Sequence, residues 1–366
     1  MESNRFDVAV VGAGLSGLTA AAFFARQKLR VALVATGPGS FVLGSGCLKT
    51  RDIAQAGNVP ALKEAMVFFC EMARFAGSPL EGDMGSSRTL PTILGELQRV
   101  SFAPRLLWNA EPRQDVATAI VGVKGLSSFD ETFMTERLNA NARAMGIACR
   151  YSARRMCFHK DLGTPAHTLR IARRFDCDPE FRSKALNALR DAARGFERIL
   201  VPSMLGLHAS ELQIADFEQA LGCQLGELPT LPPSLPGLRM FKRLWSYLHS
   251  LGVEQYQGYP VERIEICDGL CTALEVASPG HALILHGKIV VLAMGRYSTG
   301  LLAGTDAVLD AQRRSLGAHG SPIAFNLFSA RSQREAGTNS NDVEDILAGY
   351  CAAQCVLSAR GIDACQ

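Results

Sequence analysis

The opening segment constrains the fold more than any other part of the chain. A β-branched run, Val8 to Val11, leads into the spacing Gly12-x-Gly14-x-x-Gly17, and an apolar helical segment follows. A second β-branched run then covers residues 31–35. Strand, tight turn, helix and strand in this order are typical of the first βαβ unit of a dinucleotide-binding fold.

Each glycine of this turn has a predicted physical role. Gly12 permits the tight turn out of the strand, Gly14 lets a pyrophosphate approach the backbone, and Gly17 lets the helix pack closely on the sheet. We expect the phosphate at the positive end of the helix, on the N–H groups near Leu15 and Ser16. The alternative is an ordinary glycine-rich turn that holds no ligand.

The end of the second strand departs from the usual pattern. This position normally carries Asp or Glu, which binds the ribose hydroxyls, but here it is Ala35, followed by Thr36. We include Thr36 among the predicted cofactor-binding residues, and expect the site to lack tight adenosine binding.

A glycine- and serine-rich loop, residues 38–48, follows and contains Ser45 and Gly46. In flavin-binding folds such a loop passes close to the flavin ring, so we predict that both residues contact the cofactor. The alternative is a surface turn.

Short strands are predicted again near the other end of the chain, at 253–256, 261–266, 270–276 and 282–285. A separate buried strand, 288–295, ends in Ala293-Met294-Gly295, where the backbone could pass near the cofactor. We therefore predict one discontinuous flavin-binding domain, residues 1–80 and 225–366, with an inserted α/β lobe at 81–224.

Composition excludes several classes of protein. The chain has 366 residues, 48% of them hydrophobic, and a net charge of +3, which is too mild to indicate nucleic-acid binding. The apolar run at 8–25 contains the glycine motif, so we expect neither a membrane span nor a signal peptide.

Eleven cysteines are present, but the expected absence of export argues against a disulfide framework. Cys267 and Cys271 flank a predicted hairpin turn, and Cys351 and Cys355 could share a helix face. We interpret both pairs as small buried hydrophobic residues; the alternative is metal or iron–sulfur ligands shared with another chain. No metal site is predicted within the chain.

Between these regions the sequence predicts helices at 61–76, 92–98, 179–193 and 238–248, and strands at 118–121, 147–151 and 198–201. It also predicts a helix capped by Ser127 or Ser128, a loop at 77–90 and an ordered proline-rich connection at 227–237. The loop around Lys124 could bind an anion. The basic stretch 153–174 could be a solvated face, or a surface for an acidic partner chain or a phosphate. We expect a loop at 300–330 and a final helix at 343–358.

Several strings together resemble the B subunits of anaerobic glycerol-3-phosphate dehydrogenases, over roughly residues 5 to 300. The most specific is Leu228-Pro229-Thr230-Leu231-Pro232-Pro233-Ser234. The other strings are the glycine motif, Gly44 to Leu48, Ile120 to Leu126, Val291 to Arg296 and Ser298 to Gly300.

The resemblance implies a Rossmann-like FAD/NAD(P)-binding flavoprotein fold, and a flavin, FMN by family expectation or FAD. It also implies two partner chains: a catalytic one that oxidises the substrate, and an iron–sulfur protein that docks the complex on the inner face of the cell membrane. The chain itself is then cytoplasmic and relays electrons toward quinone. The family's glycine-rich turn before the last helix has no evident counterpart at residues 330–366, which suggests a remodelled half-site or a truncated chain.

No acid/base pair stands out, so no catalytic residue is predicted. Two other functions remain open at this point: a stand-alone FAD- or NAD-linked oxidoreductase, and a structural member of a redox complex that has lost its flavin.

Overall fold

The computed structural model describes residues 4–49, 59–157, 167–232, 234–280, 282–295, 309–316, 320–331 and 342–359. The chain divides into two compact units. The first comprises Met1–Phe41, Arg51–Met72 and Arg243–Gln366, and the second comprises Val42–Thr50 and Ala73–Lys242. The domain boundaries at 80 and 225 that the sequence suggests remain a prediction.

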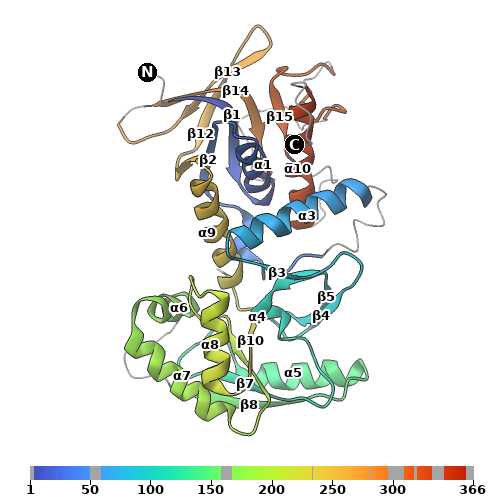
Figure 1. Ribbon diagram of the computed structural model, residues 1–366, viewed down its shortest axis with the longest axis vertical. Helices are drawn as coiled ribbons and strands as arrows, with labels where there is room; N and C mark the ends of the chain where they lie inside the picture. Colours follow the sequence, from blue (N-terminus) through green and yellow to red (C-terminus); the bar gives the residue numbers. More distant parts are fainter. Residues whose placement is uncertain are drawn as a thin grey trace. The chain divides into compact units, whose positions relative to one another are not determined.

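The first unit is built on a sheet of seven strands (Figure 1). Its parallel part has the order β11-β2-β1-β14, and β15 pairs with the other side of β14. β14 continues into an antiparallel meander with β13 and β12. The strands are β1 (Arg5–Ala13), β2 (Val31–Pro38), β11 (Glu254–Gln257), β12 (Val261–Cys267), β13 (Leu270–Val276), β14 (Leu283–Leu292) and β15 (Leu327–Ser329).

β1 lies at the centre because its sequence suits burial on both faces. Val8, Ala9 and Val10 are completely buried, as expected for a central parallel strand. β1 pairs with β14 from Arg5↔His286 to Val11↔Leu292. The prediction that the N-terminal motif and the late strand share one sheet is therefore confirmed.

Helices α1 (Leu15–Arg26), α3 (Val59–Phe75) and α10 (Asp342–Ala359) complete the first unit, although α3 extends three residues beyond the unit boundary. One side chain from each, Phe23, Phe68 and Tyr350, forms an aromatic cluster with ring centroids 5.2–5.7 Å apart. The guanidinium of Arg26 lies 4.8 Å from the centre of the Phe68 ring. The final helix predicted at 343–358 is thus confirmed and packs against α1.

Two predictions for this unit are corrected. Residues 282–285 and 288–295 are not separate strands, because β14 runs continuously and uses its first half for the meander and its second half for the parallel sheet. The predicted loop at 300–330 contains β15, a strand of three buried residues. So short a strand is stabilised by its pairing with Val290–Leu292 of β14.

The second unit contains a four-stranded parallel sheet in the order β10-β9-β7-β8. Its strands are β7 (Ala117–Val123), β8 (Arg150–Met156), β9 (Arg198–Pro202) and β10 (Gln224–Leu228). Right-handed crossovers place α5 (Glu131–Ala144) on one face and α7 (Pro179–Ala193) and α8 (Glu211–Leu221) on the other. α6 (Thr168–Cys177) packs beside α7 (Figure 1).

Smaller elements precede this sheet: β3 (Leu80–Gly82), β4 (Arg88–Pro91), β5 (Leu97–Val100), β6 (Phe102–Pro104), α4 (Arg105–Trp108) and the 3-10 turn η1 (Ser40–Leu43). The helix predicted at 92–98 is wrong, because Thr92 to Glu96 form the turn of the β4–β5 hairpin. The loop predicted at 77–90 contains β3 and the start of β4.

Three local predictions for the second unit also change. Asp130, rather than Ser127 or Ser128, caps α5 by accepting the Phe133 N–H at 2.8 Å. The strand predicted at 147–151 lies at 150–156. α9 (Leu235–Ser250) begins inside the proline-rich segment, with Pro236 in its first turn. Proline is tolerated there because the N–H groups of a first turn have no partner within the helix.

A buried ion pair holds the two ends of the proline-rich segment. The carboxylate of Glu227, at the end of β10, accepts hydrogen bonds from Arg239 at 2.5 and 2.8 Å and from the N–H groups of Met204 and Leu205, both at 2.9 Å. The Glu227 side chain is completely buried and that of Arg239 is 12% exposed. Removing either charge therefore leaves the other buried and unpaired.

We expect Glu227→Gln to lower the free energy of unfolding of the second unit by about 3 kcal/mol, because the Arg239 guanidinium loses its counter-ion. Chemical denaturation of the full chain measures the change, and the double variant Glu227→Gln/Arg239→Met should recover part of it. The exposed pair Asp191–Arg194 provides the control, since Asp191→Asn should change stability by less than about 0.5 kcal/mol. Equal effects of the two single substitutions would contradict this role.

Candidate functional site

The order of strands in the first unit identifies one candidate position for a ligand. β1 is followed by α1 and β2 on one side, whereas β14 is followed by β15 on the other. β1 and β14 are therefore the neighbouring strands at which the winding direction reverses. In open α/β sheets, ligands bind at the carboxyl ends of such strands.

Gly12, the penultimate residue of β1, lies directly against Ala293, the residue that follows β14. Its φ angle is +114°, and a Cβ atom there would overlap the carbonyl oxygen of Ala293. The Ala293 N–H donates to the Val11 oxygen at 2.8 Å. The two strand ends thus close on each other only because residue 12 has no side chain.

Two further glycines let helices approach this turn. A Cβ atom at Gly17 would overlap the carbonyl oxygen of Gly12, so α1 packs directly on the turn. A Cβ atom at Gly349 of α10 would overlap the backbone of Ser16. The first turn of α1 is consequently held between the sheet and the last helix, and Ser16 is buried.

Gly14 is different, because a Cβ atom there would have no other atom within 4 Å. It is the N-cap residue of α1, with no side-chain hydrogen bond to the helix and no acidic residue in the first turn. The chain passes close to Gly14 on one side, at Gly39, whose N–H donates to the Ala13 oxygen at 3.2 Å. Open space beside an uncapped helix N-terminus fits a phosphate group.

The open space beside Gly14 and the uncapped start of α1 fit the phosphate of a flavin nucleotide. The residues that would hold its phosphate are Gly14, Leu15 and Ser16, through backbone N–H groups at the positive end of α1. Residues 12–17 carry no ionisable side chain. This turn can therefore bind and orient, while redox chemistry would come from the flavin when bound.

The carboxyl end of β2 is held by backbone hydrogen bonds. Ala35 is buried, and its oxygen accepts the N–H groups of Gly258 at 2.8 Å and Tyr259 at 3.3 Å. Thr36 is exposed at the carboxyl end of β2. β2 carries no Asp or Glu at this end, and the lack of tight adenosine binding stays a prediction.

The predicted residues fall into two groups. Gly12 to Gly17, Thr36, Ala293 and Gly295 lie in the first unit, and Gly295 has a φ angle of +63° just after β14. Ser45 and Gly46 lie in the second unit. The family string at 296–300 is outside the described residues.

In the second unit, the loop with Ser45 and Gly46 contacts the proline-rich segment. Ser45 Oγ accepts the Cys47 N–H at 3.4 Å, and Gly46 has a φ angle of +76° beside Pro236. The Ser234 N–H donates to the Val42 oxygen at 3.1 Å. Two strings that carry the family resemblance are therefore neighbours, an association that sequence separation conceals.

Several glycines that shape the site were not predicted. Gly39 and Gly349 resemble ordinary loop and helix glycines in the sequence, and only their close approaches to Gly14 and Ser16 reveal their roles. At the loop near Lys124, the carboxylate of Glu131 occupies the space beside Gly122 and pairs with Arg155. That contact weakens the case for an anion there.

The cysteine pairs have different environments. Cys267 and Cys271 lie on the paired strands β12 and β13, as predicted. Cys271 is buried, but Cys267 is exposed at the end of β12, so its interpretation as a buried residue is wrong. Burial raises the pKa of Cys271 to about 11. Cys351 and Cys355 both lie on α10, and burial raises the pKa of each thiol although Arg313 acts in the opposite direction. Among the described residues, no group of three or more His, Cys, Asp or Glu side chains could hold a metal ion.

Comparison with known protein families indicates a flavin-binding domain at the start of the chain. Residues 7–66 match the family model described as FAD binding domain. Over 343 residues the chain is 27% identical to a protein named as the B subunit of anaerobic glycerol-3-phosphate dehydrogenase, from Pectobacterium carotovorum subsp. carotovorum (strain PC1), covering 84% of this chain and 79% of that protein. The resemblance found in the sequence is confirmed.

A protein of the same name from Yersinia pestis is 26% identical over 384 residues, covering 92% of this chain and 87% of that one. Among solved structures, a 3-ketosteroid delta1-dehydrogenase from Sterolibacterium denitrificans is 16% identical with a TM-score of 0.35, too low to support an argument. It covers 80% of this chain, which spans about half (48%) of that structure. In the part of the chain that the structure describes, no helix has the length and hydropathy to cross a membrane.

The glycine geometry predicts a contrast between two substitutions. Gly17→Ala places a methyl group on the Gly12 carbonyl and should lower the free energy of unfolding by about 3 kcal/mol. Gly14→Ala should cost less than about 1 kcal/mol, because its φ angle is −73° and the space beside it is open. Denaturant unfolding measures both, and equal losses would contradict the different surroundings of the two residues.

The exposed thiol of Cys267 and the buried thiol of Cys271 should differ in their rate of chemical modification. At pH 8 a thiol with a pKa of about 11 is ionised to only about one part in a thousand, so Cys271 should react slowly with an aromatic disulfide reagent. Cys267→Ser should remove one fast-reacting equivalent, and Cys271→Ser should remove none. If Cys271→Ser removes a fast equivalent, the burial of that thiol is wrong.

Proposed function

We propose that the chain is the flavin-binding member of an anaerobic, quinone-linked glycerol-3-phosphate dehydrogenase complex. In this role it relays the two electrons released when sn-glycerol 3-phosphate is oxidised to glycerone phosphate. The electrons pass onward to membrane quinone.

One observation carries the proposal. The two relatives from Pectobacterium carotovorum and Yersinia pestis named as B subunits match 84% and 92% of this chain. Residues 7–66, which include the glycine turn, match the FAD binding domain model. A similarity of this extent covers both compact units, so it supports the role of the whole chain rather than of a shared nucleotide-binding segment alone.

The lack of a carboxylate at Ala35 favours FMN over FAD as the cofactor. An adenosine ribose has no acidic partner from β2, while the phosphate position at Gly14 needs only backbone N–H groups. Ser45 and Gly46 are proposed to contact the flavin ring, and Thr36, Ala293 and Gly295 to border the cofactor. Substrate oxidation is assigned to a separate catalytic chain of the complex.

The partners follow from the same proposal. The catalytic chain would supply electrons, and the iron–sulfur protein would accept them and dock the complex on the inner face of the membrane. The flavin-binding chain then needs no membrane span of its own and is cytoplasmic and peripheral.

The absent ribose carboxylate also favours a second function, that of a structural member of the complex that has lost its flavin. Purification with the partner chains but without flavin would select it. Activity of the lone chain with a dye acceptor would instead indicate a stand-alone oxidoreductase.

The test is to purify the full chain, alone and with its partners, reconstitute it with FMN or FAD, and identify the flavin released by acid. We expect bands near roughly 375 and 450 nm, the usual flavin absorption, and release of FMN. Gly14→Ala should reduce retained flavin at least about fivefold, since its methyl group occupies the phosphate position, while unfolding stays near that of the wild type. Wild-type chain without flavin in every preparation would refute the proposal.

A further inference from the structure

The second unit has a switch point of its own, which the flavin proposal does not use. The chain leaves β7 toward β8 on one side and leaves β9 toward β10 on the other, so the winding reverses between β7 and β9. The loop after β9, residues 203–210, lies at the carboxyl end of that strand. Ligands in α/β sheets are found at this kind of position.

A cavity of about 110 Å³ lies at this loop, bordered by α6, α7 and α8. Pockets for nucleotides and drug-sized ligands usually measure about 300–1,000 Å³, so this one suits only a small molecule. The floor is apolar, made by Phe175, Leu205 and Phe217, all buried. Such a floor accommodates a short carbon chain.

The basic side of the cavity is Arg182. Its Nε donates to the Phe175 oxygen at 2.7 Å and its Nη2 to the Asp176 oxygen at 3.2 Å, which fixes the orientation of the guanidinium. Nη1 has no hydrogen-bond partner among the described residues. A guanidinium that is held in a fixed orientation and has one nitrogen without a partner is suited to bind an anionic oxygen.

The acidic side is Asp176, held in place by backbone. Its carboxylate accepts the N–H groups of Leu207 at 2.7 Å and His208 at 3.3 Å, and Gly206 leaves room for it. A carboxylate repels an anion but accepts a hydroxyl proton. The two sides of the cavity therefore suit two different groups of one ligand, an anionic oxygen at Arg182 and a hydroxyl at Asp176.

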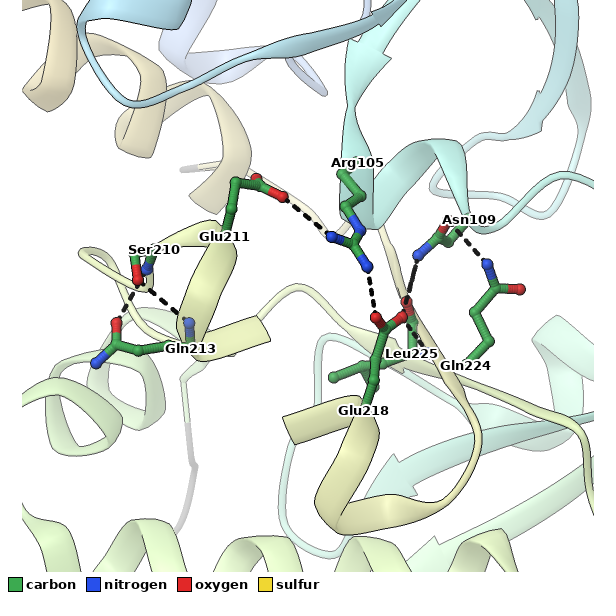
Figure 2. A network of polar contacts seen from close by, with 8 residues as sticks. All are labelled: Arg105, Asn109, Ser210, Glu211, Gln213, Glu218, Gln224 and Leu225. Carbon is green, nitrogen blue, oxygen red and sulfur yellow. Dashed lines mark hydrogen bonds and ion pairs between the residues drawn. The ribbon is translucent and has the colours of Figure 1, made fainter. Parts of the chain in front are cut away.

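Gln213 and His208 border the cavity and are exposed. The Gln213 side-chain oxygen accepts the Ser210 N–H at 2.9 Å, and Ser210 Oγ accepts the Gln213 N–H at 3.2 Å. Figure 2 shows the side-chain nitrogen of Gln213 pointing away from Ser210. That nitrogen can donate a hydrogen bond to a ligand.

The wall that carries Gln213 is firmly anchored. Arg105 pairs with Glu218 at 2.6 Å and with Glu211 at 3.6 Å, so both ends of α8 are tied to α4 (Figure 2). A polar group on a rigid element loses little entropy when it binds a ligand.

We propose that this cavity binds a small hydroxylated anion with a short carbon chain, its anionic group toward Arg182 and Gln213 and a hydroxyl toward Asp176. The chemistry fits a phosphate monoester or a carboxylate. Choosing sn-glycerol 3-phosphate as the first probe rests on the proposed function; D-glycerate is the carboxylate probe.

Isothermal titration of the full chain with each probe tests this site. Gln213→Glu keeps the capping box, since glutamate serves equally at this position, but replaces the donor with a negative charge. We expect it to weaken binding at least about tenfold. Gln219→Glu is the matched control, being the same change at an exposed position on α8 that does not border the cavity, and should bind as the wild type does.

Tight binding of one probe and not the other would identify the anionic group. The proposal is overturned if neither probe binds at millimolar concentration, if glycerol or inorganic phosphate binds equally well, or if Gln213→Glu binds as the wild type does. Flavin content and the unfolding transition are measured on the same preparations. Flavin-loaded chain that binds neither probe refutes this site alone, whereas probe binding without any flavin refutes the flavin proposal alone.

Discussion

The first unit depends on one backbone contact, the meeting of Gly12 with Ala293 at the ends of β1 and β14. Only a residue without Cβ allows the strands to end so close together, and Gly17 then lets α1 rest on the same point. Gly14 borders open space, whereas Gly12, Gly17 and Gly39 pack against neighbouring backbone. The space beside the start of α1 is therefore shaped by the close packing of the residues around it.

In the second unit, a buried ion pair organises the segments at the carboxyl edge of the sheet. Its parallel sheet is closed at the carboxyl edge by charged side chains rather than by glycines, with Glu227 and Arg239 joining the β9 loop, β10 and α9. A buried pair of this kind adds little net stability over an apolar one, but it fixes geometry. The family-specific proline segment is thereby held at both ends.

The sequence predicts the features that local chemistry determines. The glycine spacing indicated the β1–α1–β2 unit, Pro179 marked the start of α7, and the turn at Asp268-Gly269 marked the β12–β13 hairpin. It does not predict β15, because a three-residue strand exists only through its partner β14. The contact of Ser234 with Val42, and the cavity beside Arg182, likewise join segments whose association no local pattern encodes.

The position of β14 in the chain also affects the order in which the protein can form during synthesis. β1 emerges first and can pair with β2, but it lacks its other partner, β14, until residue 292 has been made. The face of α1 that packs on α10 stays uncovered until α10 follows. The sheet of the second unit is complete by residue 228. A ribosome-bound chain would thus fold its middle before its beginning, and the apolar β1–α1 segment would need protection from aggregation while it waits.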